Sequence, residues 1–379
     1  MLKCGLSLVA GVAARTPLRP RTATNTAKAV RSMRDLNHRT REGRPIELGA
    51  APGFPIVAEI AVRNGPISGI AATADGTRLV VTNHGRDSVS VIDTDSCRVV
   101  ETVGGLGEPF AVVTASADCT RAYVSTVSPA YDSIAAIDLM TYAVVATHPL
   151  AFSVSDLAVS PDGRYVYASR NRAAGADVAV LDFKTGRAEA IELPLRPAST
   201  SECVRLSADG TRLYVATTSP AGGQLVVVGK SADRWEVAGA VDIGLPIRDV
   251  ALSPDGAQAY VASCGPDWGA VIDVVDTRTA TVAGTYKIGE PSGILTGLTL
   301  SRDGDRAYVV SDDSVTVLCT LTNDVVGTLG VANEPSCVLE SPNAKYLYLA
   351  DYSGRLTVAP VASIVALGTG ASARTPELV

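Results

Sequence analysis

Histidine is scarce in this chain of 379 residues, and the sequence motifs of common enzyme classes are missing. The three histidines are His38, His84 and His148, and no G-x-S-x-G, H-E-x-x-H or phosphate-binding glycine loop occurs. His84, in the stretch Asn-His-Gly-Arg-Asp, is the one that could act as a general base. The alternative interpretation is an ordinary histidine in a surface loop. The sequence therefore assigns no catalytic residue.

Paired cysteines and long apolar runs are missing as well. The seven cysteines are odd in number and show no C-x-x-C spacing, which argues against a zinc site or a disulfide framework. We therefore expect no metal, no cofactor and buried, unpaired thiols. No uninterrupted apolar run reaches the roughly 18 residues that a membrane span requires, so no transmembrane segment is predicted. Unpaired thiols favour a reducing compartment and hence a cytoplasmic location.

Positive charge is in deficit, with 33 Lys and Arg against 39 Asp and Glu, which argues against general nucleic-acid binding. The first 50 residues are the exception, because they hold ten basic and three acidic residues. They also lack strand periodicity, so we interpret residues 1–50 as a basic, disordered leader. The alternative is export to the cell envelope, because Lys3 followed by the apolar stretch Cys4 to Ala14 resembles a weak signal peptide.

One phrase is repeated along almost the whole chain. Residues 157–169 read Leu-Ala-Val-Ser-Pro-Asp-Gly-Arg-Tyr-Val-Tyr-Ala-Ser, which is typical of a strand, a tight turn and a second strand. The spacing of about 45 residues per copy accommodates four strands and falls in the range of β-propeller blades. The turn residues of the seven copies are Asp75, Asp118, Asp162, Asp209, Asp255, Asp303 and Asn343. Positive φ is predicted at the glycines that follow, which are Gly76, Gly163, Gly210, Gly256 and Gly304.

The predicted fold is all-β: a seven-bladed β-propeller of four-stranded antiparallel blades over residues 51–370, followed by a flexible tail at 371–379. Phe54 to Val62 has the composition of a strand, yet no partner strand precedes it. The last repeat, which includes Arg355 to Val361, is one strand short of a full blade. An N-terminal strand that completes the last blade would close the ring and remove its exposed edges.

Three stretches of the first repeat resemble a known family. They read Leu-Val-Val-Thr-Asn at 79–83, Ser-Val-Ser-Val-Ile-Asp-Thr at 88–94 and Arg-Val-Val-Glu-Thr-Val at 98–103. They resemble the YVTN-repeat family of seven-bladed β-propellers, and the resemblance covers about residues 54–362. It implies the fold but little about activity, because the functions of the family differ. Neighbouring seven-bladed families include lactonases, whose histidine, arginine and carboxylate sets have no position-by-position match here.

Two sets of repeated side chains are interpreted as structural. Tyrosines recur five residues after the turn residue, and we expect them to fill the interfaces between blades. Aspartates end the third strands, where we expect them to accept hydrogen bonds from turn amides. The tyrosines are Tyr123, Tyr167, Tyr214, Tyr260, Tyr308 and Tyr348, and the aspartates are Asp93, Asp138, Asp182 and Asp276.

The candidate site is the place where the innermost strands depart from the repeat. In most copies these strands begin with small or neutral residues, but repeats three to five carry charge there. These charged residues are Asp156, Glu202, Arg205, Arg248 and Asp249. Arg205 stands where the other six copies have Ala, Thr or Leu. Loops that we expect to open at the channel mouth add Arg170, Arg172, Asp267, Trp268 and His84.

An unpaired charge in such a place is costly, so two interpretations of this set are open. One is a salt-bridge network that ties adjacent blades together. The other is a small-ligand pocket at the channel mouth, with guanidiniums for an anionic group and carboxylates for hydroxyls or a cation. We predict a monomeric, non-catalytic binding propeller for a small molecule or a protein partner. The alternative is a lactonase-like hydrolase that acts on a small anionic metabolite.

Overall fold

The computed structural model describes most of the chain between residues 55 and 362. The described residues are 55–115, 120–128, 131–151, 153–173, 175–194, 196–231, 234–265, 269–288, 295–311, 313–331, 334–362 and 377–378. The predicted leader, the turn residue Asp118 and most of the predicted tail lie outside them.

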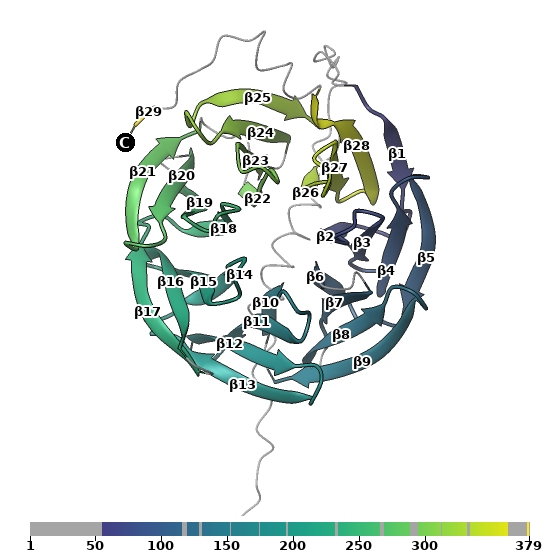
Figure 1. The fold of residues 1–379 in the computed structure, drawn as a ribbon, viewed down its shortest axis with the longest axis horizontal. Helices are drawn as coiled ribbons and strands as arrows, with labels where there is room; N and C mark the ends of the chain where they lie inside the picture. The colour runs from purple at the N-terminus through teal and green to yellow at the C-terminus, as the bar shows by residue number, and fades with distance from the viewer. Residues whose placement is uncertain are drawn as a thin grey trace, which may run out of the picture. The chain divides into compact units, whose positions relative to one another are not determined.

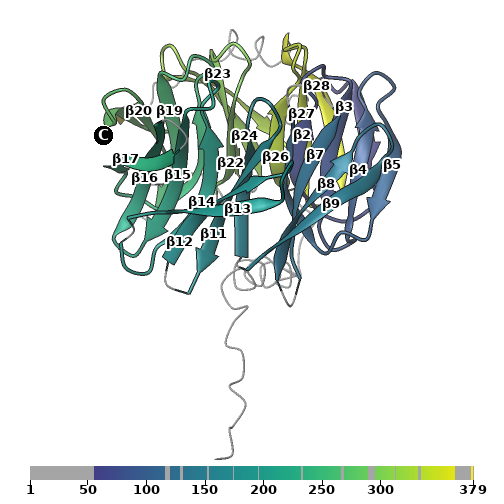
Figure 2. The same cartoon turned by 60° about the horizontal axis from the view of Figure 1, so that its bottom comes forward.

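Seven antiparallel sheets surround a central axis as the blades of a propeller (Figure 1). Each blade uses four strands that run between the two ends of the ring (Figure 2). In blades 1 to 6 the four strands are consecutive along the chain, and the first of them is innermost. The predicted all-β, seven-bladed fold is confirmed.

The strands of the blades have the following bounds. Blade 1 contains β2 (Ile67–Ala72), β3 (Arg78–Asn83), β4 (Ser88–Asp93) and β5 (Arg98–Gly104). Blade 2 contains β6 (Pro109–Thr114), β7 (Arg121–Thr126), β8 (Asp132–Asp138) and β9 (Ala143–Leu150). Blade 3 contains β10 (Ser153–Val159), β11 (Tyr165–Arg172), β12 (Gly175–Asp182) and β13 (Arg187–Glu192). Blade 4 contains β14 (Thr200–Leu206), β15 (Arg212–Ser219), β16 (Gly222–Ser231) and β17 (Arg234–Asp242).

Blade 5 contains β18 (Ile247–Leu252), β19 (Gln258–Gly265), β20 (Gly269–Asp276) and β21 (Thr281–Lys287), with β29 (Glu377–Leu378) added at its outer edge. Blade 6 contains β22 (Leu295–Leu300), β23 (Arg306–Ser311), β24 (Ser314–Cys319) and β25 (Val325–Gly330). Blade 7 contains β26 (Pro335–Glu340), β27 (Tyr346–Asp351), β28 (Arg355–Pro360) and, from the other end of the chain, β1 (Ala58–Ala61).

Strand β1 closes the ring by completing blade 7. It pairs antiparallel with β28, with Ala58 opposite Val358 and Ala61 opposite Arg355. The Val57 amide adds a hydrogen bond of 2.8 Å to the Val358 carbonyl. Ile60 is buried in an apolar cluster that also contains residues of blades 7 and 1. The first strand of the described chain therefore fastens the last blade to the first, as the sequence predicted.

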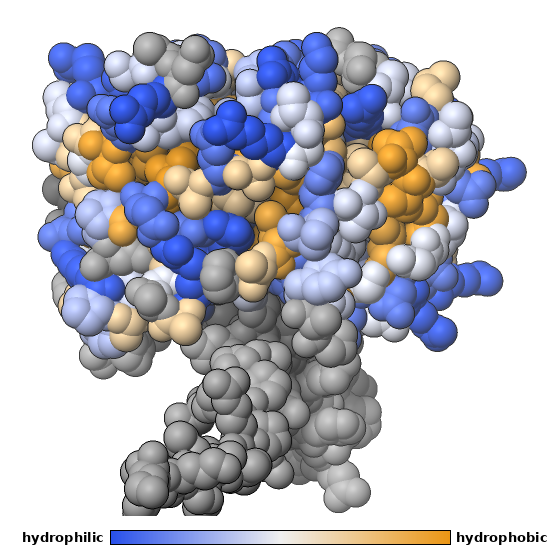
Figure 3. All heavy atoms as spheres, turned by 90° about the horizontal axis from the view of Figure 1, so that it is seen from below, coloured by the Kyte–Doolittle hydropathy of each residue, from blue (hydrophilic) through white to orange (hydrophobic). Residues whose placement is uncertain are grey.

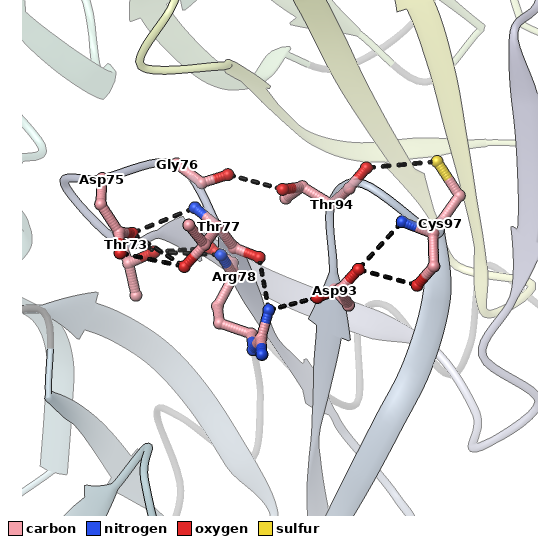
Figure 4. A network of polar contacts seen from close by, with 9 residues as sticks. Thr73, Asp75, Gly76, Thr77, Arg78, Asp93, Thr94 and Cys97 are labelled. Carbon is pink, nitrogen blue, oxygen red and sulfur yellow. Dashed lines mark hydrogen bonds and ion pairs between the residues drawn. The ribbon is translucent and has the colours of Figure 1, made fainter.

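The turn between the first two strands of a blade follows one hydrogen-bonding pattern, which Figure 4 shows for blade 1. Asp75 Oδ1 accepts from the Thr73 hydroxyl at 2.6 Å and from the Thr77 amide at 3.0 Å, while the Gly76 amide donates to the Thr73 carbonyl. Gly76 has a φ of +73°, and Ala344 takes the same place in blade 7 with a φ of +56°. Positive φ is confirmed at all five predicted glycines, Gly76, Gly163, Gly210, Gly256 and Gly304.

The recurring tyrosines lie between blades, as expected. All six are at most 4% exposed. The Tyr123 hydroxyl of blade 2 donates to the Gly163 carbonyl of blade 3 at 2.7 Å. The Tyr308 hydroxyl of blade 6 donates to a Glu340 carboxylate oxygen of blade 7 at 2.6 Å. Each ring therefore buries its apolar surface in the blade interface, and these two hydroxyls find acceptors in the next blade.

The side wall of the ring is polar with separate apolar patches (Figure 3). The outermost strands contribute exposed branched residues to it, which are Val100, Val144, Val145, Val237 and Val282. Within the described residues, no helix has the length and apolar character needed to cross a membrane. The fold thus leaves two ends of the ring, rich in turns and loops, as the places where side chains of several blades meet.

Candidate functional site

The innermost strands each contain a bulge near their start, and the bulge positions part of the charged set. In blades 4 and 5 the strand register shifts between Ser201 and Cys203 and between Ile247 and Asp249. The skipped residues are Glu202 and Arg248. A bulge leaves one residue out of the ladder and re-aims its side chain. Glu202 and Arg248 therefore occupy equivalent bulge positions in neighbouring blades, at the end of the ring where the inner strands begin.

Arg205 lies deeper in the channel wall and pairs with two carboxylates from different blades. Its guanidinium forms ion pairs with Asp156 of blade 3 and, at 2.5 Å, with Asp249 of blade 5. Its Nε donates to the Val250 carbonyl at 2.7 Å, and one terminal nitrogen also donates to the Val204 carbonyl. Four contacts thus hold one guanidinium. The side chains of Arg205, Asp156 and Asp249 are 30%, 21% and 15% exposed, so the cluster faces the channel while being largely buried.

The two aspartates also bind the backbone of the next blade. Asp156 accepts from the Val204 amide at 3.1 Å, and Asp249 accepts from the Leu298 amide at 2.8 Å. Because both aspartates occupy the same place in the repeat, each joins its own blade to the following one in the same way. The three charged residues therefore connect blades 3, 4, 5 and 6. This arrangement agrees with the interpretation of the triad as a blade-to-blade network.

Burial and mutual attraction act in opposite directions on these groups. Burial disfavours the charged form of Arg205, but Asp156 and Asp249 together outweigh it and raise the pKa of Arg205 well above its usual value. Burial raises the pKa of Asp156, and the nearby Asp249 adds to the rise, although Arg205 works against both. The cluster is thus two carboxylates sharing one guanidinium, with a net charge of −1 when all three are ionised.

Glu202 and Arg248 are less tightly bound. Glu202 accepts a hydrogen bond from the Thr200 hydroxyl at 2.9 Å, and Arg248 Nε donates to the Cys264 thiol at 3.3 Å. Burial raises the pKa of Glu202, and the positive charge of Arg248 lowers it in part. No ion pair joins the two residues in the part of the chain that the structure describes. Arg248 is exposed, so this pair offers a donor and an acceptor at the channel entrance.

The sequence led us to expect Arg170 and Arg172 in a loop, but both lie on strand β11. Arg170 makes a two-pronged contact with the fully buried Asp177 on β12, with nitrogen–oxygen distances of 2.8 and 2.7 Å. Arg172 contacts Asp177 at 3.4 Å and pairs with Glu192 on β13. The sequence analysis missed Asp177. Its signal is the register of the β11–β12 hairpin, in which Arg170 is directly opposite Asp177.

His84 stands apart from the charged cluster. It follows strand β3 in blade 1, and its ring lies edge-on to Phe110 of blade 2 with centroids 6.3 Å apart. Its Nδ1 atom is buried and has no hydrogen-bond partner among the described residues. Asp267 and Trp268 lie outside the described residues. The structure therefore brings together Asp156, Arg205 and Asp249, with Glu202 and Arg248 near them, but not His84.

Acidic groups do not gather into a metal site in the described chain. No group of three or more His, Cys, Asp or Glu side chains is placed there to hold an ion. The five cysteines in these ranges are all unpaired, and only Cys203 among them is buried. What the candidate site can do chemically is bind: Glu202 accepts hydrogen bonds or attracts a cation, and Arg248 donates to an anion.

Two curated proteins are similar to most of this chain. A seven-bladed β-propeller protein of Mycobacterium tuberculosis is 49% identical over 368 residues, which cover 90% of this chain and 93% of that protein. A seven-bladed β-propeller protein of Mycolicibacterium smegmatis is 41% identical over 276 residues, which cover 73% of each chain. No protein-family model matches. Among solved structures, a chain of the hydrazine synthase of Kuenenia stuttgartiensis superposes with a TM-score of 0.70 at 18% identity, covering 85% of this chain and all of that one. At that identity the likeness concerns the fold alone.

Proposed function

The chain belongs to the family of seven-bladed β-propeller proteins, and we propose that it is a non-catalytic binding protein whose ligand or partner contacts the channel mouth of blades 3 to 5. A propeller fold hosts many unrelated activities, so the proposal depends on the site and not on the fold. Both mycobacterial relatives are named for the same seven-bladed architecture.

One observation carries the proposal: within the innermost strands, charged residues lie in blades 3 to 5, apart from Glu340 at the last position of β26, which binds Tyr308. Two of the residues in blades 3 to 5, Glu202 and Arg248, remain available at the entrance. Arg205 is held by four contacts, so Asp156, Arg205 and Asp249 form a rigid base. Above that base, the bulges present Glu202 and Arg248 side by side in adjacent blades. A rigid base that fixes the distance between two polar groups lowers the entropic cost of binding.

The chemistry of the entrance indicates the kind of ligand. Arg248 can bind a carboxylate or phosphate, and Glu202 can bind a hydroxyl or an ammonium group. The five charged residues have a net charge of −1, so the wall also attracts a positively charged group. We therefore propose a ligand, or an exposed segment of a partner protein, that carries an acidic group together with an amine or hydroxyl.

The experiment is a thermal-shift screen of amino acids and hydroxy acids, followed by calorimetric titration of the best compound. A ligand at 100 times its Kd should add about 2.7 kcal/mol to the stability. The test variant is Glu202→Gln/Arg248→Gln, which removes one charge of each sign. The control is Arg187→Gln/Glu189→Gln, an exposed ion pair on the outer strand of blade 3. We expect at least a tenfold loss of affinity in the test variant and none in the control. Equal affinity in both variants would locate the ligand elsewhere.

A lactonase-like hydrolase acting on a small anionic metabolite is the alternative function. Such an enzyme needs a base beside the bound substrate, and the candidate base is His84. That residue belongs to blade 1, whereas the charged wall belongs to blades 3 to 5. Turnover of a lactone by the wild-type protein that is lost in His84→Gln would favour the hydrolase over the binding protein.

A further inference from the structure

A second cavity lies at the opposite end of the ring, between blades 4 and 5. It has a volume of about 530 Å³. Its walls come from the start of β15, from β16 and β17, and from the turn between β20 and β21. This volume falls within the range of roughly 300–1,000 Å³ that is typical of small-molecule sites. The candidate site at the channel mouth includes none of its residues.

The cavity lies where blade 4 lacks an arginine–aspartate register that blades 1 and 2 have. In blade 1, Arg78 begins the second strand and lies opposite Asp93, which ends the third strand, and the two form an ion pair (Figure 4). In blade 2 the register likewise places Arg121 opposite Asp138. In blade 3 the residue opposite Asp182 is Tyr165, and the preceding Arg164 pairs with Asp182 at 2.7 Å. Blade 4 keeps the arginine as Arg212, but the residue opposite it is Gly229. The missing side chain leaves both an empty volume and an arginine without its usual partner.

Arg212 turns toward the next blade as a result. One of its terminal nitrogens donates to the Thr277 carbonyl of blade 5 at 3.0 Å. This contact uses one of its five donor hydrogens and directs the guanidinium to the cavity wall. Among the described residues, Arg212 has no carboxylate within ion-pair distance. The neighbouring Asp209 is engaged by Ser207 and Thr211 in its own turn.

Two cations flank Arg212, but only one of them faces the cavity. Lys230 follows Gly229 on β16, so its side chain points to the opposite face of the sheet, where its ammonium nitrogen is 5.6 Å from the centroids of Trp235 and of Tyr165 in blade 3. Arg278 is exposed in the turn after β20. Neither forms an ion pair within the described ranges. Thr211 and Thr279 add hydroxyl groups to the wall. A second glycine, Gly239, leaves the cavity open, because a Cβ there would meet nothing within 4 Å.

We propose that this cavity is a binding site for a small metabolite that carries a phosphate group. Two arginines, Arg212 and Arg278, line the cavity and together match an oxyanion with more than one negative charge, because a guanidinium matches the geometry of phosphate oxygens. Val227 and Ala238 give the cavity an apolar part for the rest of the metabolite. The cavity shares no residue with the channel mouth, so an experiment can refute one of the two proposed sites without refuting the other.

The experiment is calorimetric titration of the full chain with inorganic phosphate and pyrophosphate, and with citrate as a polycarboxylate of similar charge. The test variants are Arg212→Gln, Arg278→Gln and Gly229→Asp. The last one restores the carboxylate that blade 1 has opposite its arginine, and a Cβ at this position meets only the Ala238 Cβ at 4.0 Å. We expect pyrophosphate to bind the wild type, at least tenfold weaker binding in Arg212→Gln and Arg278→Gln, and no binding in Gly229→Asp.

Arg78→Gln is the matched control, because it removes the same charge at the same place in the repeat, far from the cavity in sequence and in another blade. It should bind pyrophosphate as the wild type does. Circular dichroism shows whether Gly229→Asp folds. If it does not, the two glutamine variants still test whether the cavity binds pyrophosphate. The proposal is overturned if the wild type binds neither phosphate nor pyrophosphate, if citrate binds as tightly as pyrophosphate, or if the variants and the control bind alike.

Discussion

Arg205 occupies a position that carries Ala, Thr or Leu in the other six blades, and one charged side chain there changes how four blades are joined. Two carboxylates converge on it from both sides. Removing one partner of a buried ion pair is costly because the other partner stays buried without compensation. The cost is moderated here because the three side chains are 15% to 30% exposed to the channel.

We therefore predict that Arg205→Ala lowers the free energy of unfolding by about 2–3 kcal/mol, below the roughly 3–5 kcal/mol of a fully buried pair. The reason is that Asp156 and Asp249 would repel each other across the gap. The measurement is urea denaturation at pH 7. The comparison variant is Arg187→Ala, which breaks an ion pair whose side chains are 76% and 62% exposed and should cost less than about 1 kcal/mol. Equal losses would mean that Arg205 is not a structural clamp.

At the scale of the element, the tight turns of the blades use glycine because it adopts a positive φ without strain. Two of these glycines allow the cost of backbone strain to be measured apart from the cost of a steric clash. Gly163 and Gly256 both have a φ of +69°. A Cβ on Gly163 would lie 2.9 Å from the Ala115 Cβ of blade 2, whereas a Cβ on Gly256 would meet nothing within 4 Å. Gly256→Ala should therefore cost about 1 kcal/mol of backbone strain alone. Gly163→Ala should cost clearly more.

Denaturant titration of the two glycine variants measures this difference. Ala344 provides the reverse experiment, because it already holds a φ of +56° in the seventh copy of the turn. Ala344→Gly should leave stability unchanged or raise it by up to roughly 1 kcal/mol. A loss of stability in Ala344→Gly, or equal losses in the two alanine variants, would contradict this account of the turns.

The aspartates of these turns, together with those that end the third strands, predict how stability depends on pH. Hydrogen bonds from turn hydroxyls and amides, and the Arg164 contact at Asp182, lower the pKa of nine of them. A lowered pKa stabilises the fold above about pH 3.9, and that stabilisation is lost as the pH falls through the folded-state value. Burial raises the pKa of Asp132, Asp156, Glu202 and Asp273, and these four act in the opposite direction. Because the nine aspartates with a lowered pKa outnumber these four groups, they should determine how stability depends on pH.

We therefore expect the free energy of unfolding to fall between pH 5 and pH 3, as measured by urea denaturation at several pH values. Asn343 supplies the control, because its amide oxygen accepts from the Ser341 hydroxyl at 2.7 Å and from the Lys345 amide, much as the aspartates do. A variant with Asn in place of Asp75, Asp162 and Asp209 should fold and show a shallower decline. A constant or rising stability toward pH 3 would refute the assignment.

The same turns explain why the sequence was informative about the fold and less so about the site. A turn residue and a glycine act locally, so Asp75 and Gly76 could be read from their neighbours alone. The partners of Arg205 come from strands 49 and 44 residues away, and no local pattern indicates which carboxylates it meets. The role of Gly229 is even harder to predict from the sequence. Gly229 matters because it lacks a carboxylate, and this is recognised only when the strand register places Gly229 opposite Arg212.

At the scale of the whole molecule, the ring is closed by residues nearly 300 positions apart. Besides its ladder with β28, strand β1 contributes Glu59, whose carboxylate is 3.0 Å from an Arg355 terminal nitrogen. This ion pair is about half exposed and adds little. The larger contribution is Ile60, which is 5% exposed and packs in a cluster that reaches from blade 7 to blade 1. Closure thus combines backbone pairing with burial at the junction of the first and last blades.

We predict that deleting residues 1–50 leaves the melting temperature of the propeller nearly unchanged, whereas deleting residues 1–63 lowers it and causes aggregation. The longer deletion removes β1 and so uncovers the edge of β28, whose free amides and carbonyls can pair with another molecule. Calorimetry and light scattering at several protein concentrations measure the two effects. A third variant, Ile60→Asp in the full chain, keeps the backbone of β1 but places a charge in the junction, and it should lower the melting temperature as well. If both truncations melt and scatter alike, closure by the N-terminal strand does not hold the ring together.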